Sequence, residues 1–164
     1  MNYPLLDNAF TKKDLKEGIK VLKSEKLTMG KITKNFEKIF AKKIGAKHAL
    51  MVNSGSSANL LMLSTLVNPL FKNSLKINDE VLIPAICWST SLWPIVQLGL
   101  KPIFVDVDLS TLNISIKDLK NKINNKTKAI MCVHLYGVPV DIDPILKIAK
   151  NQLLRYLMIF QGFL

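Results

Sequence analysis

Met51-Val52-Asn53-Ser54-Gly55-Ser56-Ser57-Ala58-Asn59-Leu60-Leu61 is the stretch that decides the fold, because a short apolar run passes through small residues directly into a helical pattern. A helix has N–H groups without internal partners in its first turn, where its dipole places about half a positive charge. Gly55 lets the backbone approach a ligand, and Ser56 and Ser57 add hydroxyl donors. The stretch therefore predicts a phosphate site, with an ordinary helix cap as the alternative.

Short apolar strands and helices alternate after this point, which implies an α/β fold with a mostly parallel sheet and helices on both faces. Asn68-Pro69 and Gly99 are predicted to end helices, and Asp143 to cap one that has Pro144 at its first position. In such sheets ligands bind at the carboxyl ends of strands. We expect strands over 48–53, 80–85, 102–107 and 128–134, and helices over 57–67, 90–98, 116–124 and 144–150.

Composition indicates a folded domain, since the 164 residues are 49% hydrophobic and 21% charged. No run approaches the ~18 apolar residues of a membrane span, and the N-terminus has no basic stretch followed by an apolar one. We therefore expect a cytoplasmic protein without a membrane partner. Cys87 and Cys132 are two isolated thiols, which make neither a disulfide framework nor a metal-ligand set, and each is expected to be a small buried residue.

The net charge of +11 raises the question of nucleic-acid binding. Twelve lysines fall in the first 50 residues, where they occupy the polar faces of two predicted amphipathic helices. The first covers residues 12–24 behind Thr11 as N-cap, and the second ends at Gly45. Lysine supplies 22 of the 23 basic residues, whereas contacts to nucleic acid favour arginine with interleaved aromatic residues. No nucleic-acid partner is expected, only loose attraction of anions.

Further motifs carry a family resemblance. They read Pro-Ala-Ile-Cys-Trp-Ser-Thr-Ser over 84–91, Pro-Ile-Phe-Val-Asp-Val-Asp over 102–108 and Ile-Met-Cys-Val-His-Leu-Tyr-Gly over 130–137, after Thr-Met-Gly at 28–30 and Phe-Glu-Lys-Ile-Phe-Ala at 36–41. In this order and spacing, the chain resembles the DegT/StrS family of pyridoxal-phosphate-dependent sugar aminotransferases, which includes related sugar dehydratases. The resemblance implies that residues 1–150 are an incomplete large domain of the aspartate aminotransferase-like fold type I.

The family's function gives the expected activity and partners. The resemblance implies an N-terminal fragment of an enzyme that moves an amino group from an amino acid to a keto-sugar nucleotide, as a homodimer that uses pyridoxal 5'-phosphate. Two alternatives stay open: a fragment of a nucleotide-sugar dehydratase with the same cofactor, and a non-catalytic remnant or binding module.

Site residues are carried over where the motifs match. Gly55, Ser56 and Ser57 match the turn whose backbone amides hold the cofactor phosphate, and Trp88 matches the aromatic residue that stacks on the cofactor ring. The alternative for Trp88 is a tryptophan buried in the core. Thr28 and Gly30 match a loop near the substrate, and a plain helix connector is the alternative. No metal site and no catalytic residue is expected in this chain.

Two other features invite chemistry, but a structural role is expected for both. Asp106 and Asp108 share one face of a predicted strand, as a pair of acid/base or metal-binding carboxylates would. We expect them to cap the turn that follows. His134 comes just before the glycine turn at Gly137, and we expect a hydrogen-bonded structural histidine.

Residues 151–164 depart from the family pattern. The family continues into a strand that ends in an acid for the pyridine nitrogen, followed later by the lysine that binds the cofactor. Here the segment has no Asp, Glu or Lys and holds the single arginine, Arg155. The hypothesis is that residues 1–150 are the N-terminal half of a longer enzyme, with 151–164 translated out of frame. The alternative is a genuine short protein whose last strand or helix fills the edge of the sheet.

Overall fold

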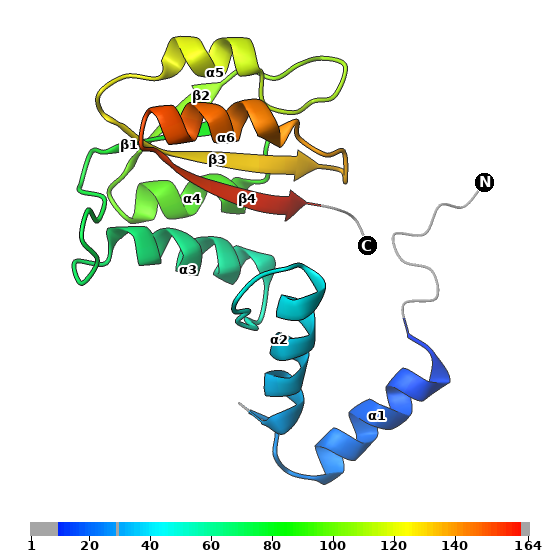
Figure 1. The fold of residues 1–164 in the computed structure, drawn as a ribbon. Coiled ribbons are helices and arrows are strands. Elements are labelled where there is room, and N and C mark those ends of the chain that lie inside the picture. The colour runs from blue at the N-terminus through cyan, green and yellow to red at the C-terminus, as the bar shows by residue number, and fades with distance from the viewer. Residues whose placement is uncertain (1–9, 29, 162–164) are drawn as a thin grey trace. The chain divides into compact units, whose positions relative to one another are not determined.

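The computed structural model describes residues 10–28 and 30–161, and these fall into two compact units (Figure 1). One unit contains the described residues up to Asn53, and the other begins at Ser54.

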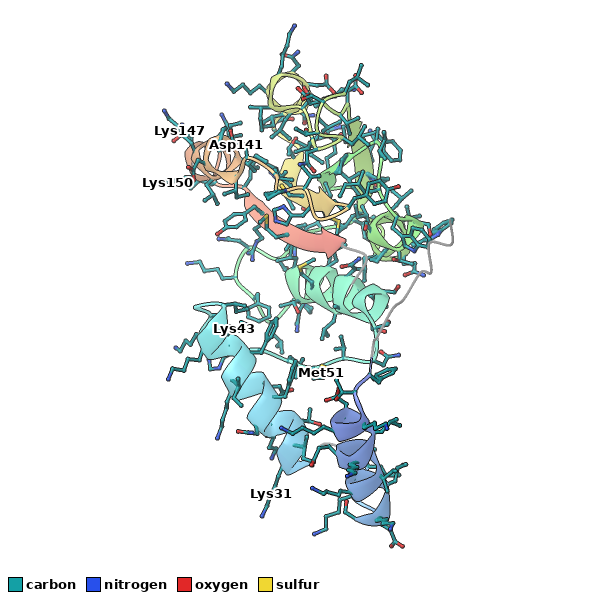
Figure 2. All side chains as sticks on the ribbon, turned by 90° about the vertical axis from the view of Figure 1, so that its right-hand side faces the viewer. Lys31, Lys43, Met51, Asp141, Lys147 and Lys150 are labelled. Carbon is teal, nitrogen blue, oxygen red and sulfur yellow. The ribbon has the colours of Figure 1, made fainter. Side chains whose placement is uncertain are left out.

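The N-terminal unit contains α1 (Lys12–Lys23) and α2 (Lys31–Lys43), both of which the sequence predicts. Thr11 caps α1, since its hydroxyl accepts the Asp14 N–H at 3.2 Å while the Asp14 carboxylate accepts the Thr11 N–H at 2.8 Å. Gly45 follows α2 in the left-handed region with φ +70°, as a helix-ending glycine does. Figure 2 labels Lys31 and Lys43 at the two ends of α2, which carries lysines along its exposed side.

The strand expected over residues 48–53 is a correction, because this segment forms no strand. A strand needs a neighbour for its backbone groups, and the segment pairs with none of the described strands. The Met51 N–H instead donates to the Glu37 carboxylate at 2.9 Å. The apolar residues of this segment have the pattern of a strand, but the described chain provides no neighbouring strand for them to pair with.

The second unit is a four-stranded sheet with two helices on each face. The strands are parallel in the order β2-β1-β3-β4, which confirms the predicted α/β class. Predicted and observed ends differ by at most two residues for most elements. In chain order they are α3 (Gly55–Val67), β1 (Glu80–Pro84), α4 (Ser89–Gln97), β2 (Lys101–Val105), α5 (Ile116–Lys122), β3 (Thr127–Leu135), α6 (Ile142–Asn151) and β4 (Arg155–Gln161).

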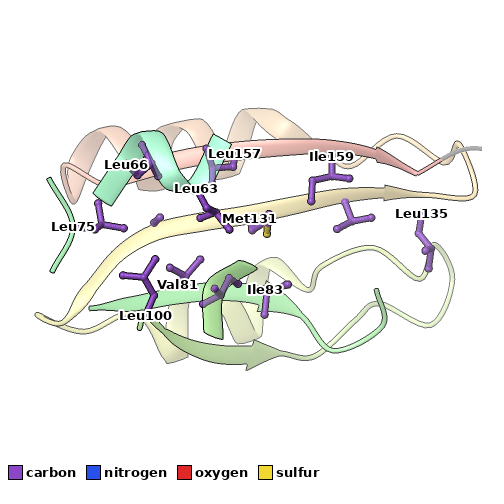
Figure 3. Packing of buried hydrophobic residues seen from close by; sticks show 13 residues of the cluster. Leu63, Leu66, Leu75, Val81, Ile83, Leu100, Met131, Leu135, Leu157 and Ile159 are labelled. Atoms are coloured by element: carbon purple, nitrogen blue, oxygen red, sulfur yellow. The ribbon is translucent and has the colours of Figure 1, made fainter. Parts of the chain in front are cut away.

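Two apolar clusters hold the helices against the sheet. One packs α3 and α4 on the face that carries Val81, Met131 and Leu157, and Figure 3 shows Leu63 and Leu66 of α3 directed toward this face. The other packs α5 and α6 on the opposite face. Alternate residues of the central strands supply both clusters, so β1 and β3 are buried along nearly their whole length.

The start of α6 is a second correction. The helix begins at Ile142, two residues before the expected first helical residue, so Asp141 is the N-cap and Pro144 lies at the third helical position. Proline is tolerated there because N–H groups of the first turn have no partner within the helix. Figure 2 shows Lys147 and Lys150 of α6 directed away from the sheet.

The tail beyond residue 150 joins the sheet. β4 pairs in parallel with β3 from Ala129↔Arg155 to Leu135↔Gln161, and Leu157 and Ile159 are buried in the core. This is the geometry expected if the last segment is a genuine strand that fills the edge of the sheet. The hypothesis of a shifted reading frame stays a prediction.

Candidate functional site

A cavity of about 540 Å³ opens at the carboxyl end of the sheet, between the beginnings of α3 and α4. This is the edge at which ligands bind in parallel α/β sheets. Its walls combine a few polar groups with a larger apolar area, as ligand sites generally do. The lining residues are Gly55, Ser56, Ala58, Asn59, Met62, Ile86, Cys87, Trp88, Thr90, Ser91, Leu135, Tyr136, Met158 and Ile159.

The beginning of α3 offers two backbone donors to the cavity. Ser54 is the N-cap, and its hydroxyl oxygen accepts the Ser57 N–H at 3.1 Å. The N–H groups of Gly55 and Ser56 take no partner among the described residues, and both residues line the cavity. Free N–H groups at the positive end of a helix are suited to an anion such as phosphate.

The predicted phosphate turn is therefore only partly gathered at the cavity. Gly55 and Ser56 line it, whereas Ser57 does not, and the Ser57 amide is engaged by the helix cap. Ser54 caps the helix, as the alternative for this stretch has it, and the Gly55 and Ser56 amides remain available to a ligand, so phosphate binding here stays a prediction. The role of Ser57 toward phosphate stays a prediction.

Trp88 lies at the rim of the cavity as the N-cap residue of α4. Its side chain is 60% exposed, which contradicts the alternative of a tryptophan buried in the core. An exposed indole beside a cavity offers a flat face on which an aromatic ring can stack. Gly55, Ser56 and Trp88 thus line one cavity, and their roles toward a phosphate and a ring stay predictions.

Asn59 connects the two sides of the cavity. It is 8% exposed, and its amide nitrogen donates to the Thr90 carbonyl at 3.2 Å. This bond ties α3 to the first turn of α4, and so fixes the distance between the two free amides and Trp88. The quoted motif includes Asn59, but no local pattern marks this residue, since its bond crosses 31 residues.

Tyr136 also lines the cavity, and it was not singled out from the sequence as a site residue. It follows β3 with φ +52°, and Gly137 follows with φ +79°, so two consecutive residues are left-handed. Such a conformation is uncommon for a bulky residue and recurs at functional sites. Asn113 holds the loop beyond them, with its amide nitrogen donating to the carbonyls of Val138 at 3.1 Å and Pro139 at 3.0 Å.

His134 and Asp108 make the structural hydrogen bonds expected of them. The Nδ1 atom of His134 accepts the Val140 N–H at 2.9 Å, and burial lowers the pKa of this histidine. The Asp108 carboxylate accepts the Ser110 hydroxyl and the Ser110 N–H, and these bonds lower its pKa, which confirms the turn-capping prediction. The Asp106 carboxylate accepts the N–H of its neighbour Val107 at 2.8 Å, and it makes no bond to the turn within the described chain, so the capping expected of Asp106 is not observed. Within the described ranges, no three His, Cys, Asp or Glu side chains group as a metal site would require.

The two cysteines remain thiols. Cys132 is fully buried in the sheet, where burial raises its pKa to about 12, and this confirms the expected packing role. Cys87 is half-buried and lines the cavity, and burial raises its pKa as well. A raised pKa keeps the nucleophilic thiolate rare, so neither residue suits covalent chemistry.

Thr28 and Gly30 belong to the N-terminal unit, whereas the residues that line the cavity belong to the other unit. Thr28 is exposed, and Gly30 is the N-cap residue of α2 in an extended conformation. Both residues lie between α1 and α2, as the alternative of a plain helix connector has it. Contact of Thr28 or Gly30 with a substrate stays a prediction. None of the helices in the described ranges has both the length and the apolar character needed to cross a membrane.

Comparison with known proteins gives three findings. A family model for the DegT/DnrJ/EryC1/StrS aminotransferase family matches residues 8–157. GDP-4-keto-6-deoxy-D-mannose 3-dehydratase of Yersinia pseudotuberculosis is 43% identical over 93% of this chain and 38% of its own length. GDP-perosamine synthase of Escherichia coli O157:H7 is 39% identical over 75% of this chain and 32% of its own.

The fold is similar to solved structures from the same group. The E. coli GDP-4-keto-6-deoxy-D-mannose-3-dehydratase with bound hydrated PLP superimposes with a TM-score of 0.90 at 43% identity, over 96% of this chain and 40% of that one. This likeness confirms the predicted fold type I architecture, in its N-terminal part. The chain spans about 40% of the length of these relatives.

Proposed function

The chain belongs to the DegT/DnrJ/EryC1/StrS aminotransferase family, and on this premise we propose that it forms the phosphate-binding and ring-stacking part of a pyridoxal-phosphate site for a nucleotide-linked keto sugar. The observation that carries the proposal is one cavity with two free amides of α3 on one side and the exposed Trp88 on the other. The cavity of about 540 Å³ is within the usual size of cofactor sites.

The residues present fit pyridoxal phosphate. The Gly55 and Ser56 amides hold the phosphate group, and Trp88 offers its indole to the ring. The cavity also contains a buried hydroxyl without a partner in the described chain, on Ser91, which suits a ligand with polar atoms on its ring. When bound, this cofactor supplies an electron sink that stabilises a carbanion next to the substrate nitrogen.

The chain's own residues bind and orient. Asn59 keeps the amides and Trp88 in register through its bond to the Thr90 carbonyl, so the phosphate and ring of one ligand are held at once. Apolar walls from Leu135 and Ile159 exclude water and strengthen the polar contacts that remain. This half of the site therefore fixes where the cofactor lies.

We further propose 3-dehydration of a GDP-linked 4-keto-6-deoxy sugar as the reaction of the whole enzyme. Support comes from the Yersinia and E. coli relatives with this activity, each about 43% identical over more than nine-tenths of the chain. This choice replaces the aminotransferase reaction that the motifs favoured. Transamination remains the second candidate, because GDP-perosamine synthase is 39% identical. The amino-acid donor, the homodimeric state and the cytoplasmic location belong to the same proposal.

Equilibrium dialysis of the 164-residue chain against pyridoxal phosphate tests the site. We expect saturable binding, weakened about tenfold by Trp88→Leu, because aromatic stacking contributes roughly 0.5–1.5 kcal/mol beyond area burial. Trp93→Leu is the matched control, since Trp93 is also about half exposed on α4 but lies outside the cavity lining. Equal affinity for wild type and Trp88→Leu, or no binding by wild type, would refute the proposed site.

Two chimeras test the reaction class. Residues 1–157, the end of the family match, are joined to the remaining C-terminal part of either the 3-dehydratase or the perosamine synthase. With GDP-4-keto-6-deoxy-D-mannose and glutamate, we expect the dehydratase chimera to retain the larger share of its parent's kcat/KM. A larger share in the synthase chimera would favour transamination instead.

A further inference from the structure

Ser91 carries an unusual hydroxyl. The residue is 1% exposed in the first turn of α4, and its Oγ is the one buried side-chain polar atom in the described part of the chain that has no hydrogen-bond partner. Buried hydroxyls are nearly always paired, because an unmet hydrogen bond is costly in an apolar environment. An unpaired group that persists in a native fold calls for a partner that the described chain does not contain.

The location of Ser91 indicates what that partner is. Ser91 lines the same cavity as Gly55, Ser56 and Trp88, and its neighbours in the lining from β3 and β4 are apolar, namely Leu135, Met158 and Ile159. The other buried polar side chain of the lining, Asn59, is already engaged with the Thr90 carbonyl. Among the described residues that line the cavity, Ser91 thus carries the one buried side-chain polar atom without a hydrogen-bond partner, next to apolar side chains of β3 and β4.

Helix geometry relates Ser91 to Trp88. The two residues are three positions apart, the Ser91 N–H donates to the Trp88 carbonyl at 2.9 Å, and residues three apart lie on one side of a helix. Trp88 is 60% exposed, whereas Ser91 in the same lining is 1% exposed. A ring stacked on Trp88 would therefore lie beside the part of the lining that Ser91 contributes.

We propose that Ser91 orients the ligand, by hydrogen bonding to a polar atom on the edge of the stacked heteroaromatic ring remote from the phosphate group. The inference rests on the proposed function and deepens it. The phosphate is held at the beginning of α3, the ring face lies on Trp88, and Ser91 fixes the rotation of the ring about the axis perpendicular to that face. Three separate contacts determine a single pose.

Ser91→Ala tests this proposal, with Ser89→Ala as the matched control, because Ser89 is exposed on the same helical turn and does not line the cavity. We expect Ser91→Ala to weaken binding of pyridoxal phosphate about 3- to 10-fold, the value of one hydrogen bond, in equilibrium dialysis. Binding of inorganic phosphate, which engages only α3, should stay unchanged. Two analogues of pyridoxal phosphate, methylated at the pyridine nitrogen or at the 3-hydroxyl, then identify the atom that Ser91 contacts. The analogue methylated at that atom should bind wild type and Ser91→Ala with equal affinity.

The thermal midpoint of the ligand-free chain separates this role from a structural one. Removal of a buried, unpaired hydroxyl should leave the midpoint of Ser91→Ala unchanged or higher than in wild type. A lower midpoint, or unchanged affinity for pyridoxal phosphate while wild type binds it, would overturn the proposal for Ser91 alone. Failure of wild type to bind pyridoxal phosphate would instead overturn the proposed function, and this inference with it.

Discussion

Asn113→Ala is expected to destabilise the loop that follows Tyr136, a residue of the cavity lining. Asn113 is 5% exposed, and its amide nitrogen donates to the carbonyls of Val138 at 3.1 Å and Pro139 at 3.0 Å. Each such bond contributes about 0.5–1.5 kcal/mol, so the loss of both costs about 2 kcal/mol in the free energy of unfolding. For a chain of 164 residues this lowers the thermal midpoint by roughly 4–8 °C.

Asn113→Asp makes the same argument sharper, because the side chain keeps its shape but loses both donors. A carboxylate oxygen would then face two carbonyl oxygens at the distances where N–H donors now lie. We therefore expect Asn113→Asp to be less stable than Asn113→Ala, since Ala removes the bonds without adding a repulsive acceptor.

Urea unfolding followed by circular dichroism measures both variants against wild type. Asn121→Asp is the control, because Asn121 is exposed on α5 and tests the effect of the added charge alone. The denaturation midpoint should fall in the order wild type, Asn113→Ala, Asn113→Asp, with unchanged slopes. The reasoning is refuted if Asn113→Asp unfolds at the midpoint of wild type or above that of Asn113→Ala.

Three further outcomes follow from the structure. Burial lowers the pKa of His134, so the unfolded chain binds a proton at a higher pH than the folded chain does. The contribution of His134 to stability should be complete above about pH 6.5 and should fall as the pH decreases below that value. Urea midpoints measured across pH 5–8 should therefore decrease more steeply toward low pH for wild type than for His134→Gln. Leu63→Ala, at a fully buried position of α3, should cost about 3 kcal/mol by urea unfolding, whereas Leu61→Ala, 43% exposed on the same helix, should cost under about 1 kcal/mol. A maleimide probe should label Cys87 slowly and Cys132 only on unfolding, with pyridoxal phosphate protecting Cys87 alone; labelling of both at one rate would contradict their placement.

Local signals account for what the sequence predicted well. Thr11 with Asp14, Gly45 and Gly99 fix helix ends through bonds and conformations that involve only neighbouring residues. The free amides of Gly55 and Ser56 follow in the same way from a small-residue turn ahead of a helix. The beginning of α6 was misplaced because two acids precede Pro144 within four residues, and either one is a plausible cap.

Tertiary contacts account for what the sequence could not predict. The apolar run at 48–53 has the composition of a strand, but only the fold decides whether a neighbouring strand is available. The bond from Asn113 to the Val138 carbonyl crosses 25 residues, and nothing in the local sequence marks it. Ser89 and Ser91 are equivalent in the sequence motif, and only packing makes one exposed and the other buried without a partner.

The strand order β2-β1-β3-β4 has a consequence for how this sheet is assembled during translation. Once β1 and β2 have emerged from the ribosome and paired, β3 adds to the vacant side of β1, and β4 then adds to the vacant side of β3. Every new strand docks on an outer margin, so no pair that has already formed must separate to admit a later one. Each increment closes a βαβ crossover of modest length, which keeps the entropic barrier of each step small. The sheet can therefore add its strands in the order in which they are synthesised, while translation continues.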